Sequence, residues 1–283
     1  MEETAVETKK LKQMERNSIQ LTIGGAEEYR RCGTRFGGRP DVPPGFQWPV
    51  FEGERFDGEV KVRPLTFLAQ FNCGELAPWD SEHLLPDRGL LSFFYEAEVQ
   101  PWGYDPRDRG GARVFWFEDT DLLSPADFPA EMEDYCKFPM IRIQARQAPS
   151  WPGPEDFFSG GLEETEDGDF DAAREALGEE DPEVCSKLLG WPNVIQNSMA
   201  AQCDLVTQGY YLGRTWDDVP PEIRKRAEES ALDRWQLLFQ LDVVEGDDFC
   251  LMFGDSGRVY FYIPREDLPA RRFDRVWAIL QCC

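Results

Sequence analysis

The chain has 283 residues, of which 41% are hydrophobic and 13% aromatic, so it can bury one large core or two modest cores. Its formal net charge of −24 argues against a nucleic-acid partner, because binding to phosphates depends on Lys and Arg. The charged N-terminal stretch contains no apolar signal segment, and no later run approaches the roughly 18 to 20 apolar residues of a membrane span. We therefore expect a cytoplasmic protein that binds neither nucleic acid nor membrane.

The acidic residues are concentrated in one segment. After the Pro-rich break QAPSWPGP, 13 acidic residues and one basic residue lie between Glu155 and Glu183. Such a surface suits a basic protein partner. We expect four segments, of which the two β-rich halves form one compact pseudo-twofold domain: an N-terminal arm (1–34), a first β-rich half (35–149), an acidic connector (150–185) and a second β-rich half (186–283).

The first half combines a turn signal with three strand-like runs. The turn signal is GRPDV (38–42), and the runs, rich in β-branched and aromatic residues, are FLAQFN (67–72), GLLSFFY (89–95) and RVFWF (113–117). Gln70 lies inside the first run between apolar neighbours. An inward-facing amide at that position has to find hydrogen bonds, so Gln70 is a candidate binding residue.

The loop QPWGYDPRDRGG (100–111) carries side chains that are unusual for a plain hairpin. Gln100, Trp102 and Tyr104 offer an amide, an indole and a phenol. Asp105 and Arg107 add charge. These residues are candidates for holding a planar or peptide-like ligand. The alternative is a long structured hairpin whose Trp and Tyr cover the edge of the core.

The acidic connector contains one helical pattern and a fragment of a calcium motif. Phe170, Ala173 and Leu177 recur at helical spacing and predict a short helix. The sequence DGD resembles part of an EF-hand loop, but with Gly168 at position six the twelfth position is Arg174, where the motif requires Glu. We therefore expect a solvated acidic surface without a calcium site.

The second half repeats the order of the first. GWPNV (190–194) is followed by LLFQLD (237–242), GRVYFYI (257–263) and RVWAI (275–279). The added sequence PPEIRKRAEESALDRW predicts a helix with Asp217 or Asp218 as its cap and with Ile223, Ala227 and Ala231 at helical spacing. The expected fold is therefore α+β and internally duplicated, with two related, mainly antiparallel β units and a few flanking helices.

Together these blocks resemble a known family. The sequence carries RFGGRPDVPPGFQWP, PLTFLAQFN, LLPDRGLLSFFY, QPWGYDPRDRGG, SKLLGWPNVIQ, WQLLFQLD, FGDSGRVYFYI and VWAILQC, and in this order they resemble the bacterial YwqG-like family, a domain of unknown function. The resemblance covers the chain from about Arg35 to Cys282. It implies an α+β fold with an internal pseudo-repeat, and it implies no reaction, cofactor or catalytic residue.

Three further candidate residues come from the second half. Gln240 occupies the position in its block that Gln70 occupies in the first half. The two amides would recognise a ligand together if they faced each other across a cleft; the alternative is that each satisfies backbone groups. Asp255 and Arg258 come from GDSGR (254–258). GDSG matches part of a serine-protease signature, but the single His of the chain favours its interpretation as a tight turn.

The sequence leaves two functions open. We expect a non-enzymatic binding or interaction protein without a cofactor or metal, whose cleft between the two halves takes a basic protein partner or a small ligand. The alternative is a hydrolase or transferase that uses carboxylates in the same cleft. Asp105 and Asp255 would be those carboxylates, because desolvation beside aromatic blocks would raise the pKa of each.

Overall fold

The structure is a computed structural model and describes residues 2–26, 28–54, 58–159, 167–178 and 185–283. Much of the predicted acidic connector, including the first part of the sequence compared with a calcium loop, lies outside these residues. Across the described residues, we find no helix with the length and apolar character that crossing a bilayer requires.

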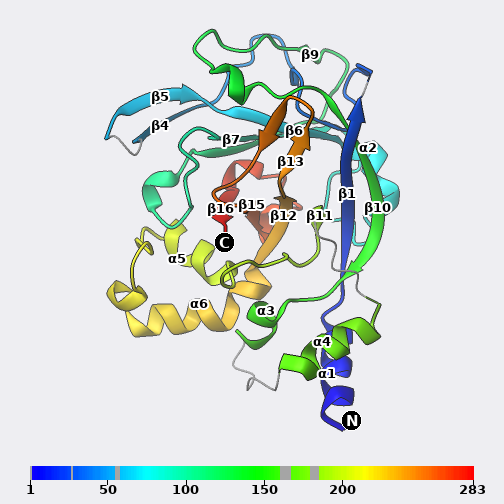
Figure 1. The fold of residues 1–283 in the computed structure, drawn as a ribbon, viewed down its shortest axis with the longest axis vertical. Helices are drawn as coiled ribbons and strands as arrows, with labels where there is room; N and C mark the ends of the chain where they lie inside the picture. The colour runs from blue at the N-terminus through cyan, green and yellow to red at the C-terminus, as the bar shows by residue number, and fades with distance from the viewer. Residues whose placement is uncertain (1, 27, 55–57, 160–166, 179–184) are drawn as a thin grey trace.

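Ten strands form one continuous antiparallel sheet (Figure 1). In spatial order they are β16 (Trp277–Gln281), β15 (Arg258–Pro264), β12 (Trp235–Leu241), β11 (Ser186–Leu189), β1 (Arg16–Ala26), β10 (Ile141–Ser150), β2 (Arg35–Phe36), β6 (Thr66–Asn72), β7 (Leu90–Tyr95) and β8 (Ala112–Phe117). Further two-stranded sheets pair β3 (Asp41–Val42) with β9 (Ser124–Pro125), β4 (Val50–Glu54) with β5 (Val60–Pro64), and β13 (Val244–Gly246) with β14 (Phe249–Leu251).

The large sheet curls until its two ends face each other across the main core. The rings of Phe71 on β6 and Phe239 on β12 have centroids 5.2 Å apart, and those of Phe93 on β7 and Phe261 on β15 are 5.3 Å apart. In the sheet order, β11, β1, β10 and β2 separate β12 from β6. Since neighbouring strands are about 4.8 Å apart, a flat sheet would hold Phe71 and Phe239 more than ~20 Å apart. The sheet is therefore nearly barrel-shaped.

Strands that are covered on both faces explain the continuous apolar runs in the sequence. β6, β7, β12 and β15 are buried along almost their whole length. On β15, Phe261 faces the main core, whereas Tyr260 and Tyr262 belong to a second cluster formed with the helices α5 (Ala200–Thr207) and α6 (Pro221–Arg234). The predicted strand runs at 67–72, 89–95, 113–117, 237–242, 257–263 and 275–279 are confirmed, with shifts of one or two residues at their ends.

The predicted fold class is wrong. The sequence predicts an α+β fold of two related β units, but the strands belong mainly to one antiparallel sheet, and the structure does not show an internal duplication. The two sets of strands are joined through β1 and β10, which pair from Arg16 with Ser150 to Ala26 with Ile141. β1 lies in the segment expected as an N-terminal arm, and it also pairs with β11. Backbone hydrogen bonds therefore run without a break from one set of strands to the other.

The helices lie mostly at one end of the molecule (Figure 1). Phe170 and Ala173 are buried in a small cluster with Leu11, which confirms the short helix predicted in the connector. The helix predicted after the two prolines is present, with Ala227 and Ala231 buried. Pro220 is the residue at its N-cap, and Asp217 and Asp218, predicted as caps, lie in a preceding 3-10 turn. The helices are α1 (Glu2–Gln13), α2 (Cys73–Leu76), α3 (Pro154–Phe158), α4 (Asp167–Ala176), α5 (Ala200–Thr207) and α6 (Pro221–Arg234).

Candidate functional site

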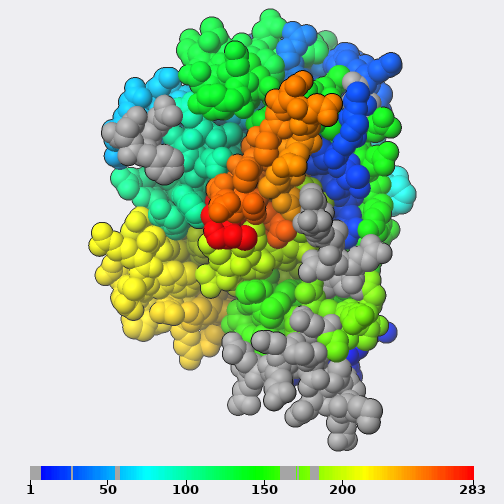
Figure 2. Space-filling view, in the orientation of Figure 1, coloured from blue at the N-terminus to red at the C-terminus, as the bar shows by residue number. Residues whose placement is uncertain are grey.

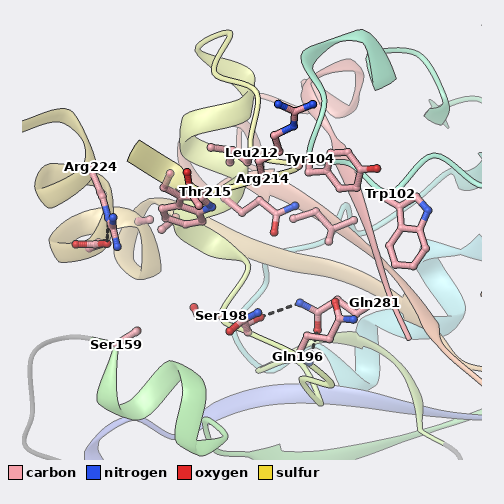
Figure 3. A pocket seen from close by; sticks show the side chains of 18 of the residues that line it. Trp102, Tyr104, Ser159, Gln196, Ser198, Leu212, Arg214, Thr215, Arg224 and Gln281 are labelled. Atoms are coloured by element: carbon pink, nitrogen blue, oxygen red, sulfur yellow. Dashed lines mark hydrogen bonds and ion pairs between the residues drawn. The ribbon is translucent and has the colours of Figure 1, made fainter. Parts of the chain in front are cut away.

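A cavity of about 700 Å³ lies beside β16, between the loop 96–111 and the helices α5 and α6. Its volume is in the range of small-molecule sites, roughly 300 to 1,000 Å³. Figure 3 shows the side chains around it, including Trp102 and Tyr104 from the loop and Gln281 from β16. The lining also includes Arg214 and Trp216, from the segment between α5 and α6.

Backbone hydrogen bonds fix the loop 96–111 on the open edge of the sheet. The backbone N–H of Leu280 on β16 donates to the Trp102 carbonyl at 3.1 Å, and the N–H of Leu212 donates to the Tyr104 carbonyl at 2.8 Å. The Trp277 indole Nε1 donates to the Gly103 carbonyl at 2.9 Å. The loop thus covers the edge strand β16, and it holds Trp102 and Tyr104 at the cavity.

Amide side chains organise the floor of the cavity. Gln281 accepts hydrogen bonds from the backbone N–H groups of Ile195 and Gln196, each at 3.1 Å, and donates to the Asn197 carbonyl at 2.8 Å. The Gln196 side chain donates to the Cys282 carbonyl at 2.8 Å, and its own Oε1 accepts no hydrogen bond from the described residues. An acceptor that lines a cavity without an internal partner is available to a ligand.

The charges at the cavity are not all paired. Arg224 bonds to Glu228 at 2.7 Å, and its guanidinium lies 5.6 Å from the centroid of the Trp216 ring. Arg214, also labelled in Figure 3, forms no ion pair with any described residue. Arg214 is exposed at the lining of the cavity, and a guanidinium without an ion pair offers a site for a carboxylate or a phosphate.

Trp102 and Tyr104 are the two residues among the sequence-predicted candidates that line this cavity. Gln100, in the same loop, points elsewhere: its side chain donates to the Met252 carbonyl and accepts from the Gly254 N–H. It thereby attaches the loop to the segment that follows the β13–β14 hairpin. This hairpin crosses the face shown in Figure 2. Gln100 therefore has a structural role.

Asp105 and Arg107 form a local pair instead of a site. Asp105 caps a 3-10 turn and accepts hydrogen bonds from the backbone N–H and the guanidinium of Arg107, whose side chain is 84% exposed. Burial acts to raise the pKa of Asp105, but these hydrogen bonds and the charge of Arg107 outweigh it and lower that pKa. The predicted rise in the pKa of Asp105 is therefore wrong, and this carboxylate is not suited to general acid catalysis near neutral pH.

Gln70 and Gln240 are satisfied separately, each by its own neighbourhood. Gln70 accepts from the backbone N–H of Asp41 and donates to the Gly33 carbonyl, both at 3.0 Å. Gln240 accepts from the backbone N–H of Asn193 at 2.9 Å and donates to the Cys185 carbonyl. Both amides are fully buried. The structure thus supports the alternative in which each amide bonds to backbone groups. The two amides do not face each other across a ligand site in the described residues.

Asp255 and Arg258 also lie away from the cavity lining. Asp255 is exposed in the turn 254–257 before β15, where Phe253 and Gly257 form a β-bridge, as expected for a tight turn. Arg258 donates from Nε to Asp242 Oδ2 at 2.7 Å and from Nη1 to the Asn193 carbonyl at 3.2 Å. Arg258 therefore supports a buried turn, and Asp105 and Asp255 do not form a catalytic pair at this cavity.

The sequence interpretation missed the wall formed by residues 197–232. A signal was present in GYYLGRTWDD (209–218), where glycines, aromatic residues and Arg214 occur together in a stretch between two helices. Its place opposite Trp102 depends on tertiary packing, because the two segments are more than 100 residues apart in the chain.

The comparisons with known proteins identify the family. Residues 34–282 match the domain of unknown function DUF1963. The chain belongs to this family. All residues that line the cavity, from Trp102 to Gln281, fall inside the DUF1963 match, so the cavity is part of the family domain. No curated protein matches the chain. The expected membership in a family without an assigned function is thus confirmed.

A partly buried carboxyl in the loop of this DUF1963 domain predicts a dependence of stability on pH. Burial raises the pKa of Asp108 to about 6, although Asp108 Oδ2 accepts the Gly103 N–H at 2.8 Å. In the unfolded chain the pKa is about 3.9, so the folded state holds this proton more tightly. The stability from this group is therefore fully present below about pH 4 and is lost as the pH rises through about 6.

Asp108→Asn is expected to keep an acceptor for the Gly103 N–H and to remove the partly buried charge. At pH 7.5 the variant should be more stable than the parent by about 1 to 2 kcal/mol, allowing for the partial exposure of this side chain. Urea unfolding at pH 5, 6 and 7.5 should show this advantage shrinking as the pH falls, with the exposed Asp255→Asn as the control. An advantage that is the same at all three pH values would contradict the assignment.

Proposed function

We propose that this DUF1963 domain is a binding protein whose cavity takes a small planar or peptide-like ligand that carries an anionic group. The observation that carries the proposal is the combination of Trp102 and Tyr104, free amide acceptor capacity at Gln196, and the unpaired Arg214 around one cavity of about 700 Å³. Aromatic faces suit planar groups, amides suit peptide-like groups, and a guanidinium suits a carboxylate.

Arg214 refines the expectation from the sequence, although the charged residues of the lining balance, with Arg214 and Arg224 against Asp217 and Glu228. The net charge of −24 favours a basic protein partner, whereas Arg214 favours an anionic ligand at this position. The narrower resemblance to the YwqG-like family belongs to the same proposal, and it supplies no reaction that would favour an enzyme. We therefore place the small anionic ligand ahead of the basic partner for this cavity.

The test uses N-acetyl-tryptophan, which combines an aromatic ring, an amide and a carboxylate, and its amide as a neutral match. In isothermal titration calorimetry, the parent should bind the acid more tightly than the amide. Arg214→Gln should weaken binding of the acid about tenfold and leave binding of the amide unchanged, since it removes one charge-assisted contact. Trp102→Ala should weaken the binding of both compounds.

Two controls separate binding from folding. Arg107→Gln changes an exposed arginine in the same loop that does not line the cavity, and it should bind both compounds like the parent. Thermal unfolding of every variant should show that the fold is kept. If the parent binds neither compound, or if Arg214→Gln binds the acid as the parent does, the proposed ligand class is wrong.

A further inference from the structure

A second cavity, of about 820 Å³, is rich in arginine. The arginines among its lining residues are Arg109, Arg226, Arg234, Arg265 and Arg275. Three carboxylates line it as well, so basic groups outnumber acidic groups here. In the whole chain the balance is reversed, with 30 basic and 54 acidic residues. This cavity is therefore a local basic site on an acidic protein.

The two cavities lie on different faces of α6. Arg224, Glu228 and Ala231 line the first cavity, whereas Arg226 and Asp233 line the second. At about 100° per residue, the first three side chains point to one side of the helix and the other two to the opposite side. A ligand in the second cavity is therefore independent of the function proposed for the first.

Several of these arginines have no carboxylate partner among the described residues. Arg234 pairs with Asp204, and Arg275 approaches Asp267 at 3.8 Å. In contrast, Arg226 and Arg265 donate to neutral amides, to Gln208 Oε1 at 3.3 Å and to Gln236 Oε1 at 2.8 Å. Arg109 lies over the Trp277 ring with its guanidinium carbon 5.6 Å from the centroid. Three positive charges at this cavity are thus left without an ionic partner in the part of the chain that is described.

Arg265 is the least satisfied of the three. Its Nε is buried and has no hydrogen-bond partner among the described residues, which is a costly state for a charged donor. The positive charge of Arg265 also acts on Arg16. Burial first, and then the positive charge of Arg265, lower the pKa of Arg16 to about 10. A bound anion would offset the repulsion between these groups.

We propose that this cavity binds a small phosphorylated molecule, with Arg109, Arg226 and Arg265 holding the phosphate. A phosphate presents several acceptor oxygens and about two negative charges, which match the planar forks of several guanidinium groups better than a single carboxylate does. The volume of about 820 Å³ exceeds the need of a phosphate alone, and Trp235, Trp277 and Pro264 supply apolar wall for the remainder of the molecule.

Isothermal titration calorimetry of the full chain with inorganic pyrophosphate tests this site. The parent should bind pyrophosphate, and Arg265→Gln and Arg226→Gln should each weaken binding at least tenfold. Arg226 is exposed, so its replacement keeps the test valid if the loss of Arg265 disturbs the fold. The control is Lys225→Gln, which removes an exposed positive charge from the same helix and lines neither cavity. It should bind pyrophosphate as the parent does.

Three outcomes would overturn the proposal. The first is a parent that does not bind pyrophosphate, and the second is a loss in Lys225→Gln as large as that in Arg226→Gln, because binding would then follow net charge alone. The third is equal binding of malonate, which would remove the preference for phosphate. If the first outcome is found, vesicles containing phosphatidic acid distinguish the sources of the phosphate: a chain that binds these vesicles and not pyrophosphate recognises a lipid headgroup instead of a small soluble molecule.

Discussion

Replacing Asp41 with alanine is expected to lower the free energy of unfolding by about 3 to 5 kcal/mol, because it leaves a buried arginine without its counter-charge. Asp41 is fully buried, and its Oδ2 accepts from Arg35 Nη1 at 2.9 Å and from Gln70 Nε2 at 2.8 Å. The same oxygen accepts the backbone N–H of Cys32, and Oδ1 accepts the Tyr29 hydroxyl at 3.0 Å. One carboxylate thus satisfies four donors.

The groups around Asp41 cannot form hydrogen bonds with water in its place when the carboxylate is lost. Arg35 is 1% exposed, and its Nε already has no partner among the described residues. The variant would therefore bury an uncompensated guanidinium. Gln70 Nε2 would keep its bond to the Gly33 carbonyl but lose the one to Asp41, and each loss carries a desolvation cost. We expect the turn that precedes β3 to lose its order and β2 to weaken, since both β2 and β6 are attached to this group.

Chemical unfolding followed by tryptophan fluorescence measures the effect. Asp127→Ala is the matched control, because Asp127 pairs with Arg39 at 2.6 Å while its side chain is 91% exposed. Exposed ion pairs contribute only about 0 to 1 kcal/mol, so this variant should unfold nearly as the parent does. A loss in Asp41→Ala no greater than that in Asp127→Ala would show that the buried pair does not stabilise the fold.

The role of Asp41 shows how far the sequence leads. The pattern GRPDV predicts a turn. In the structure, Gly37 and Gly38 have φ of 60° and 70°, and the carbonyl of the next residue, Arg39, accepts a hydrogen bond from Arg35 of the buried Arg35–Asp41 pair. The pattern does not reveal that its fourth residue, Asp41, accepts four hydrogen bonds. Those donors come from positions 6 to 29 residues away, and their meeting depends on how the strands pair.

The same limit explains the wrong fold class. Strands such as β7 and β12 are buried on both faces and therefore appear as continuous apolar runs, which sequence patterns detect. β1 and β10 join the two sets of strands but contain many polar residues, as in RNSIQLTIGGA and IRIQARQAPS. They pair with each other across more than 100 residues of chain. Local periodicity cannot show such a pairing, so the continuous sheet was not predictable from it.

The candidate site was predictable in part for a related reason. The loop 100–111 stands out in the sequence because Trp102 and Tyr104 are unusual in a hairpin, and the structure places both at the cavity. Gln70 and Gln240 also stand out in the sequence. A buried amide is equally suited to hydrogen bonds with the backbone groups of a turn, and the hydrogen bonds show that both amides have this role. Residue type alone does not distinguish these roles.

Replacing Gly103 with alanine is expected to destabilise the domain by about 3 kcal/mol or more and to disrupt the first cavity. Gly103 has a φ of +79°, in the left-handed region, and a Cβ at this position would lie 2.1 Å from the Ala278 carbonyl oxygen. That oxygen belongs to β16, which the rest of the sheet holds in place. The loop would have to move away from β16 and would break the contacts that its backbone makes there.

The effect on binding follows from the same displacement. The Trp102 carbonyl accepts from Leu280 and the Gly103 carbonyl accepts from Trp277 Nε1, so a shifted loop loses both bonds and carries Trp102 and Tyr104 away from the cavity. Gly45→Ala is the matched control, because Gly45 has a φ of +76° and a Cβ added there would have no described atom within 4 Å. It should lose only the ~1 to 2 kcal/mol of left-handed strain.

Urea unfolding and N-acetyl-tryptophan titration of both variants separate backbone strain from the clash with β16. If Gly103→Ala loses no more stability or affinity than Gly45→Ala, the loop is not packed tightly against β16. Other contacts must then cover the edge of the sheet.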